Sequence, residues 1–299
     1  LTISSRNSDN SFHIILDRVL PLAEMNVRND NPYRHLKRVE LMENGEPENK
    51  VDIVILGDGY AEDEMDRYIS DARDAMKELF SEDPFKEHQE RFNVWAVESP
   101  SPESGVDEPR KGFYKATFFD TSFNTFNLDR YAMTSSIKTL RDVAACVPYD
   151  FIIIIFNSSR YGGGGIYNLY AMVTGNHARR GVLPHEMGHC MAALGDEYVD
   201  SSVAYIDFFP EGVEPWEPNL TALINGAPPK WASMIPEDTP IPTPAKRGFF
   251  ETVGCFEGAG YKPEGLYRPS FDCIMRSCKN GFCPICRNAL METIRFYTE

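Results

Sequence analysis

The stretch from Pro184 to Tyr198, which reads PHEMGHCMAALGDEY, constrains this chain more than any other part of its sequence. It contains His185, Glu186 and His189 in a His-Glu-x-x-His pattern. Because an α-helix turns about 100° per residue, the two histidines would project from one face, one turn apart. That separation lets two imidazoles hold one tetrahedral zinc ion, and Glu186 beside them can act as general base on a zinc-bound water. The pattern therefore predicts a helix that carries the zinc site of a hydrolase.

The residues around this pattern favour a helix buried in a core. Apolar side chains surround the histidines, and a glycine follows at a position that is expected to end the helix. These residues are Met187, Met191, Ala192, Leu194 and Gly195. The alternative is a chance match in an ordinary buried helix. Two unpaired histidines and a carboxylate in such a helix would be costly without a metal ion, which favours the zinc site.

Two histidines leave the zinc site short of one protein ligand. The next acidic residues are Asp196 and Glu197. If the helix continued, Asp196 would lie about 10 Å beyond His189 along the axis, too far to bind the same ion. If the chain reverses at Gly195, either acid can return to the metal. From the residues alone, both acids are candidates for the third ligand.

Composition and charge narrow the class of protein. With 299 residues and 42% hydrophobic residues, the chain can form one sizeable core, or one core with a smaller appendage. Its formal net charge of -15 argues against nucleic acid or an anionic membrane as partner. The longest apolar run, Phe151 to Phe156, is too short to span a bilayer. The expected partner is a protein or peptide substrate.

The two ends of the sequence bear on its location. The first ten residues lack the basic and apolar regions of a signal peptide, and a start at Leu1 is typical of a mature or trimmed chain. Cysteines crowd the last 45 residues, which indicates either disulfides or a second metal site. Their spacing lacks the two Cys-x-x-Cys knuckles of a zinc ribbon, so we predict disulfides in an oxidising, extracytoplasmic compartment. These cysteines are Cys255, Cys273, Cys278, Cys283 and Cys286, whereas Cys146 and Cys190 are expected to be free thiols.

Apolar runs and turn residues predict the organisation of the chain. Residues 1–48 form an N-terminal segment or the tail of a preceding domain, and residues 49–299 form the main domain. The patterns predict an α/β (or α+β) domain with a mixed, mostly parallel sheet. A run of four glycines, residues 162–165, is interpreted either as a flexible lip that lets a substrate backbone approach or as a mobile surface loop. The predicted strands are residues 51–56, 92–97, 149–156 and 166–174, and the predicted helices are 62–80, 135–145 and a closing helix over 286–297.

Several motifs together resemble the bacterial IgA peptidase family of metallopeptidases. The most specific is the His-Glu-x-x-His pattern followed by Asp196-Glu197-Tyr198. The other matching stretches are VDIVILGDGY from Val51, PESGVDEP from Pro102, the glycine run, and CIMR from Cys273. The resemblance covers residues 49–299, and its motifs are specific in combination.

The resemblance implies a metzincin-like zincin fold with an active-site helix and a C-terminal helix. Asp196 would be the third zinc ligand, beside His185 and His189. Met275 would form the Met-turn, a hydrophobic floor beneath the zinc. This sequence departs from the metzincin pattern in having Ala192 where that pattern has a glycine, and Gly195 where it has a third histidine.

The rim of the site is implied in the same way. Residues 162–170 would form the rim and the edge strand that pairs with substrate in extended form, with Gly163, Gly164, Gly165 and Ile166 as the substrate-binding residues. Tyr198 is a candidate donor to the oxyanion, although packing under the end of the helix is the favoured role.

These features predict a zinc-dependent endopeptidase that uses Glu186 as general base on a zinc-bound water. Its substrates would be secreted host proteins or glycoproteins, with immunoglobulin A among the candidates. One alternative is a non-catalytic module that binds protein or glycan on a peptidase fold, and another is a zinc hydrolase of small peptides. The intact glutamate and both histidines favour the enzyme over the binding module.

Overall fold

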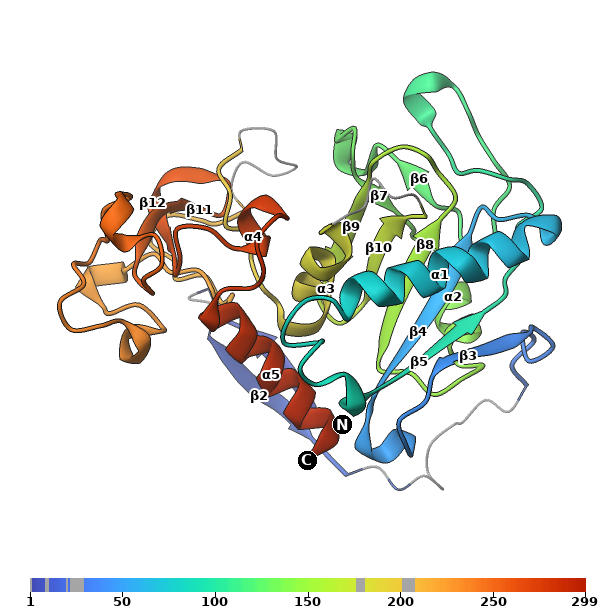
Figure 1. Cartoon of the computed structure of the whole chain (residues 1–299), viewed down its shortest axis with the longest axis horizontal. Helices are drawn as coiled ribbons and strands as arrows, with labels where there is room; N and C mark the ends of the chain where they lie inside the picture. The colour runs from blue at the N-terminus through green and yellow to red at the C-terminus, as the bar shows by residue number, and fades with distance from the viewer. Residues whose placement is uncertain (1, 9–10, 20, 22–29, 176–180, 201–207) are drawn as a thin grey trace.

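The computed structural model describes residues 2–8, 11–19, 21, 30–175, 181–200 and 208–299 of the chain. Its centre is a six-stranded sheet (Figure 1) in which β5, β4, β8 and β10 run parallel, and the outer strands β3 and β9 run antiparallel to their neighbours. This confirms the predicted mixed, mostly parallel sheet. In spatial order the strands are β3 (Arg38–Met42), β5 (Phe92–Val97), β4 (Val51–Asp58), β8 (Phe151–Phe156), β10 (Tyr170–Thr174) and β9 (Gly163–Ile166).

The central strands are mostly apolar because helices cover both faces of the sheet. On one face, Ile53 and Ile153 pack in a core with residues of three helices, α1 (Met65–Leu79), α3 (Val182–Ala192) and α5 (Pro284–Thr298). On the other face, Val54 and Ile152 pack with α2 (Ile137–Ala144). Figure 1 shows α1 crossing the face that it covers. The arrangement is a three-layer α/β/α domain.

Smaller elements lie around this domain. The helix α4 (Ile274–Ser277) and the hairpin of β11 (Phe256–Ala259) and β12 (Lys262–Arg268) lie to one side of the sheet, beyond α3 (Figure 1). The other two-stranded sheets are β1 (Thr2–Arg6) with β2 (Phe12–Asp17), and β6 (Ser122–Phe123) with β7 (Ala132–Met133). No helix in the described residues is long and apolar enough to cross a membrane.

The structure corrects two of the predicted elements. The prediction of one strand over residues 166–174 is wrong, because Ile166 ends β9 and a turn separates it from β10. The glycine run before it is not a loop, since Gly163 to Gly165 belong to β9. By contrast, the predicted strand 92–97 and the closing helix match β5 and α5 closely.

The predicted boundary between the N-terminal segment and the main domain, at residue 48, does not coincide with the edge of the central sheet. The strand β3 lies within the first 48 residues, yet it pairs with β5 at the edge of the central sheet. The division of the chain at residue 48 stays a prediction.

A pair of aspartates lies at the beginning of two central strands, where β4 and β8 start. The backbone N–H of Asp52 donates to Asp150 Oδ2 at 2.8 Å, and the N–H of Asp150 donates to the carbonyl oxygen of Asp52 at 2.7 Å. The carboxylate of Asp52 accepts a further hydrogen bond from Asn93. Burial, with a smaller contribution from the charge of Asp52, raises the pKa of Asp150 to about 6.

This aspartate gives the stability of the fold a testable pH dependence. The pKa of Asp150 is higher in the folded chain than in the unfolded chain, so its favourable contribution is present below pH 4 and is lost as the pH rises through about 6. Asp150→Asn keeps the acceptor for Asp52 and carries no charge. We expect the unfolding free energy of the variant, relative to that of wild type, to increase by about 1 kcal/mol when the pH is raised from 5 to 8. The change is this small because Asp150 is only half-buried. Denaturant unfolding at both pH values checks this, and a pH-independent difference would contradict it.

Candidate metal centre and substrate cleft

The helix α3 carries the His-Glu-x-x-His pattern through the core. It is apolar almost all round, which is why it packs between the sheet and the C-terminal segment and not on the surface. It ends at Ala192, and Ala193 adopts a left-handed conformation with φ of 53°. The N–H of Ala193 donates to the His189 carbonyl at 3.1 Å. The chain therefore reverses two residues before Gly195, where the sequence predicted the turn.

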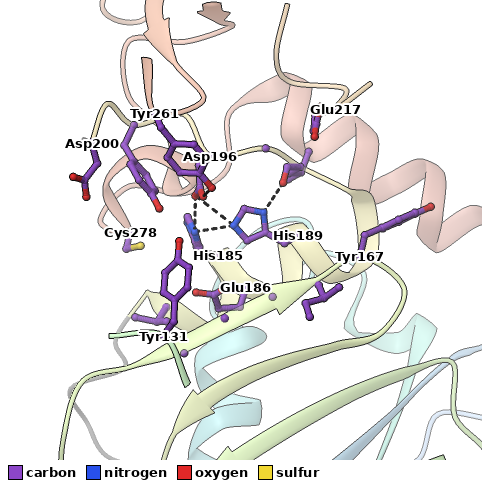
Figure 2. A pocket seen from close by; sticks show the side chains of 18 of the residues that line it. Tyr131, Tyr167, His185, Glu186, His189, Asp196, Asp200, Glu217, Tyr261 and Cys278 are labelled. Atoms are coloured by element: carbon purple, nitrogen blue, oxygen red, sulfur yellow. Dashed lines mark hydrogen bonds and ion pairs between the residues drawn. The ribbon is translucent and has the colours of Figure 1, made fainter. Parts of the chain in front are cut away.

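This reversal brings three acceptor atoms together. Asp196 Oδ1 lies 3.1 Å from His185 Nε2 and 3.3 Å from His189 Nε2. The two Nε2 atoms are 3.1 Å apart. Figure 2 shows the carboxylate and both imidazoles directed toward one another. All three residues are largely buried.

The protonation of the imidazoles follows from their other nitrogens. Nδ1 of His185 lies 3.0 Å from the carbonyl oxygen of Ile274, and Nδ1 of His189 hydrogen-bonds to the carbonyl oxygen of Leu194. A carbonyl can only accept, so each Nδ1 carries a proton and each Nε2 faces Asp196, as a donor when the ring is charged and with a lone pair when it is neutral. Burial lowers the pKa of both histidines, but Asp196 outweighs this and raises both values overall. Carbonyls that fix the ring in this way are a common outer shell of metal-binding histidines.

Three ligand atoms that meet in a buried space, one of them a carboxylate oxygen, can hold a cation between them. Asp196 Oδ1 is buried, and no group other than the two imidazoles faces it as a donor. Burial alone would raise the pKa of Asp196, but the two histidines lower it overall, so the carboxylate is charged. Ligands about 2.0–2.1 Å from a tetrahedral zinc lie roughly 3.3 Å apart, close to the spacing of these atoms. The residues fit the group that the sequence pattern indicated.

The sequence left both Asp196 and Glu197 as candidates for the third ligand, and in the structure their side chains point to different groups. The side chain of Asp196 joins the histidines, whereas that of Glu197 turns away, to Asn219 and Cys286. Asp196 Oδ2 accepts a hydrogen bond from the Tyr261 hydroxyl, which orients the carboxylate.

Glu186 lies beside the metal-binding face of α3, below His185 in Figure 2. Its carboxylate is next to Gly165 of β9, where an added Cβ would lie 3.0 Å from Glu186 Oε2. Burial raises the pKa of Glu186, partly offset by the two histidines. A carboxylate in this position can exchange a proton with a water in the cleft.

Met275 packs beneath α3. It is fully buried, and an added Cβ at Gly188 would lie 2.8 Å from its sulfur. Its carbonyl oxygen accepts the N–H of Glu197 at 2.9 Å. The segment of Met275 therefore contacts both the helix that carries the histidines and the loop that carries Asp196.

A cleft of about 730 Å³ opens over these groups. One wall is β9, from Gly163 to Ile166, which is the outer strand of the sheet and pairs with β10 on one side. On its other side, Gly163 is bridged to Tyr131. The glycines let this strand lie close on α3, since an added Cβ at Gly165 would lie 2.5 Å from the carbonyl oxygen of Glu186. Aromatic side chains, including Trp216 and Tyr167, line the cleft farther out.

Sequence reasoning missed several residues of the cleft. Tyr261 and Tyr131 line it, and so does Arg130, but each is distant in sequence from α3 and lies outside any recognisable pattern. Cys278 also lines the cleft and lies within hydrogen-bonding range of His185. Tyr198 packs edge-on against the Tyr261 ring, with centroids 5.4 Å apart.

The disulfide prediction is wrong in this structure, where all seven cysteines are free. Cys278 lies in the cleft, apart from the group that Cys273, Cys283 and Cys286 form with Glu197. Cys146 and Cys190 are free, as predicted. The cysteine argument for an oxidising compartment therefore no longer holds, and a location outside the cytoplasm stays a prediction that rests on the acidic charge.

Comparison with known families agrees with the geometry. Residues 39–252 and 247–294 match the family described as IgA Peptidase M64. No curated protein is significantly similar to the chain in sequence. The finer resemblance to metzincins stays a prediction, but the family match runs from β3 into α5 and includes the whole of α3. The chain therefore belongs to the IgA peptidase M64 family.

Proposed function

We propose that this chain is a zinc-dependent endopeptidase in which His185, His189 and Asp196 hold the zinc and Glu186 is the general base. The family makes the chain a peptidase, and the proposal adds the metal, the ligands and the base. The observation that carries it is the meeting of three ligand atoms within 3.3 Å of one another in a buried space, where nothing but the two imidazoles faces Asp196 Oδ1.

When bound, zinc supplies Lewis-acid activation of water and of the scissile carbonyl. Glu186 takes the proton of the attacking water and returns it to the leaving amine. Glu186 lies beside the metal-binding face of α3 and next to β9, so its carboxylate would be within reach of the water and of the leaving amine. Tyr131, whose side chain lies near Glu186 in Figure 2, is the proposed donor to the developing oxyanion.

The shape of the cleft supports a polypeptide substrate. The edge strand β9 can pair with an extended chain, and it would place a peptide bond over the metal-binding residues. Its glycines leave room for a second backbone. We propose proteins or glycoproteins secreted by a host as substrates, with immunoglobulin A as one candidate.

Replacing the proposed base tests the chemistry apart from the metal. Glu186→Gln keeps the size of the side chain but cannot accept the proton, so kcat should fall by about 10²- to 10⁴-fold. The metal content should not change, because Glu186 is not among the proposed ligands. The measurements are peptide hydrolysis on a casein or peptide library and elemental mass spectrometry. Glu62→Gln, an exposed residue before α1, is the matched control, and an active Glu186→Gln would contradict the assignment.

Two neighbouring glycines of β9 test how the strand positions the base. Gly165→Ala would place a Cβ 2.5 Å from the Glu186 carbonyl and 3.0 Å from its carboxylate, so it must displace α3 or the strand. At Gly164 the nearest atom is Met133 Cε at 3.2 Å, the end of a flexible side chain.

We therefore expect Gly165→Ala to lower kcat by roughly tenfold or more, whereas Gly164→Ala has a smaller effect on kcat. Metal content is measured beside kcat, because the Cβ added at Gly165 also lies 3.0 Å from the Cβ of His189, a proposed zinc ligand. Steady-state kinetics with one peptide substrate compares them, and equal losses of kcat would show that contact with Glu186 is not the cause.

A further inference from the structure

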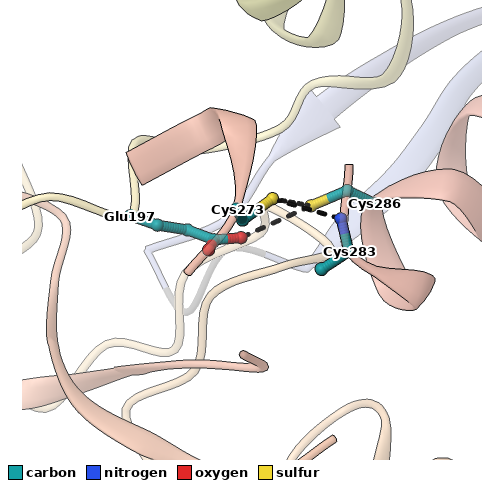
Figure 3. A group of neighbouring side chains, drawn as sticks. All are labelled: Glu197, Cys273, Cys283 and Cys286. Carbon is teal, nitrogen blue, oxygen red and sulfur yellow. Dashed lines mark hydrogen bonds between the residues drawn. The ribbon is translucent and has the colours of Figure 1, made fainter. Parts of the chain in front are cut away.

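Four side chains that the proposed function does not use converge behind the metal centre. They are Glu197, Cys273, Cys283 and Cys286, whose ligand atoms all lie within 4.8 Å of one another (Figure 3). Each is buried, with Glu197, Cys273 and Cys286 fully so. Three sulfurs and a carboxylate are a complete tetrahedral set for zinc.

The spacing of the sulfurs fits a metal better than a disulfide. Cys273 Sγ and Cys286 Sγ are 3.8 Å apart. Two thiolates bound to one tetrahedral zinc at about 2.3 Å lie roughly 3.8 Å apart, whereas a disulfide requires about 2.05 Å. A disulfide would also use only two of the three sulfurs.

The carboxylate is the second and independent observation. Glu197 has no exposed surface, and its Oε2 is buried without a hydrogen-bond partner. Its Oε1 accepts from Asn219 Nδ2 at 2.9 Å and from the Cys286 thiol at 3.4 Å. Burial raises the pKa of Glu197, because an ionised carboxylate among thiols, with one oxygen unpaired, is costly unless a cation compensates it.

Burial raises the pKa of Cys273 and Cys286, but the backbone around the sulfurs would stabilise thiolates bound to a metal ion. The N–H of Cys283 donates to Cys273 Sγ at 3.3 Å. Cys283 is the N-cap of α5, and Cys286 lies in its first turn, where the helix dipole stabilises negative charge. Arg268, which is also buried, adds a positive charge nearby.

We propose that Glu197, Cys273, Cys283 and Cys286 bind a second, structural zinc ion. All four tetrahedral positions are filled by protein, so this site has no place for water or substrate. Its ligands come from three segments of the chain, namely the loop after α3, the segment before α4 and the start of α5.

The second site would hold the first in place because ligands of the two sites, or residues that orient them, are neighbours along the chain. Glu197 directly follows Asp196, and Cys273 directly precedes Ile274, whose carbonyl orients His185. The same segment carries Met275, which receives the N–H of Glu197. A structural ion at this point would hold the proposed third ligand and the floor of the catalytic site in place.

Metal counting on the full chain, purified with zinc under reducing conditions, tests the proposal. Wild type should hold two zinc equivalents per chain, and His189→Ala and Cys283→Ser should each hold one. Cys146→Ser, at a half-buried cysteine outside both groups, should keep two. If His189→Ala folds and holds no zinc, the second site does not exist. If only the second site is real, wild type holds one equivalent, which His189→Ala keeps and Cys283→Ser loses.

X-ray absorption at the zinc edge of wild type removes any dependence on how the variants fold. The second zinc has three sulfur ligands at about 2.3 Å and the first has none, so the spectrum, which averages the two ions, should show zinc–sulfur scattering at that distance. A spectrum with no zinc–sulfur scattering would overturn the proposal. So would a disulfide among Cys273, Cys283 and Cys286 after purification under reducing conditions, detected by mass spectrometry of proteolytic peptides.

Discussion

The meeting of two imidazoles and a carboxylate in a buried space is the constraint on which the rest of this structure depends. The ligand atoms of His185, His189 and Asp196 lie within 3.3 Å of one another, an arrangement that a bound cation would stabilise. The carbonyls of Ile274 and Leu194 orient the two rings, and the reversal at Ala193 returns the aspartate to them. The sheet and α5 supply the rigid core against which α3 is held.

Much of the fold could be predicted from the sequence because buried parallel strands are continuous apolar runs. Val51 to Leu56 and Phe92 to Val97 were readable for this reason, and so was the apolar helix that carries the His-Glu-x-x-His pattern. The glycine run in β9 was not, because glycine has no strand propensity and its place is decided by contact with α3. The helix ended at an alanine in a left-handed conformation, which propensity argues against.

The site was predictable only where its residues are close in sequence. Two histidines and a glutamate on one helix define their own geometry, but the third ligand depends on how the chain turns after Ala192. Tyr261 orients Asp196 from a hairpin 65 residues away along the chain, and no local sequence pattern predicts this contact. Cysteine spacing led to disulfides because it does not reveal that Glu197 lies among the thiols. Adjacent acids, Asp196 and Glu197, thus face two different clusters.

The central claim is that a zinc ion lies where His185, His189 and Asp196 meet. Anomalous diffraction on both sides of the zinc absorption edge, from crystals grown with zinc, locates the ion directly. The account predicts an anomalous peak about 2 Å from both Nε2 atoms and from Asp196 Oδ1. A zinc-saturated crystal with no peak at that point would contradict it.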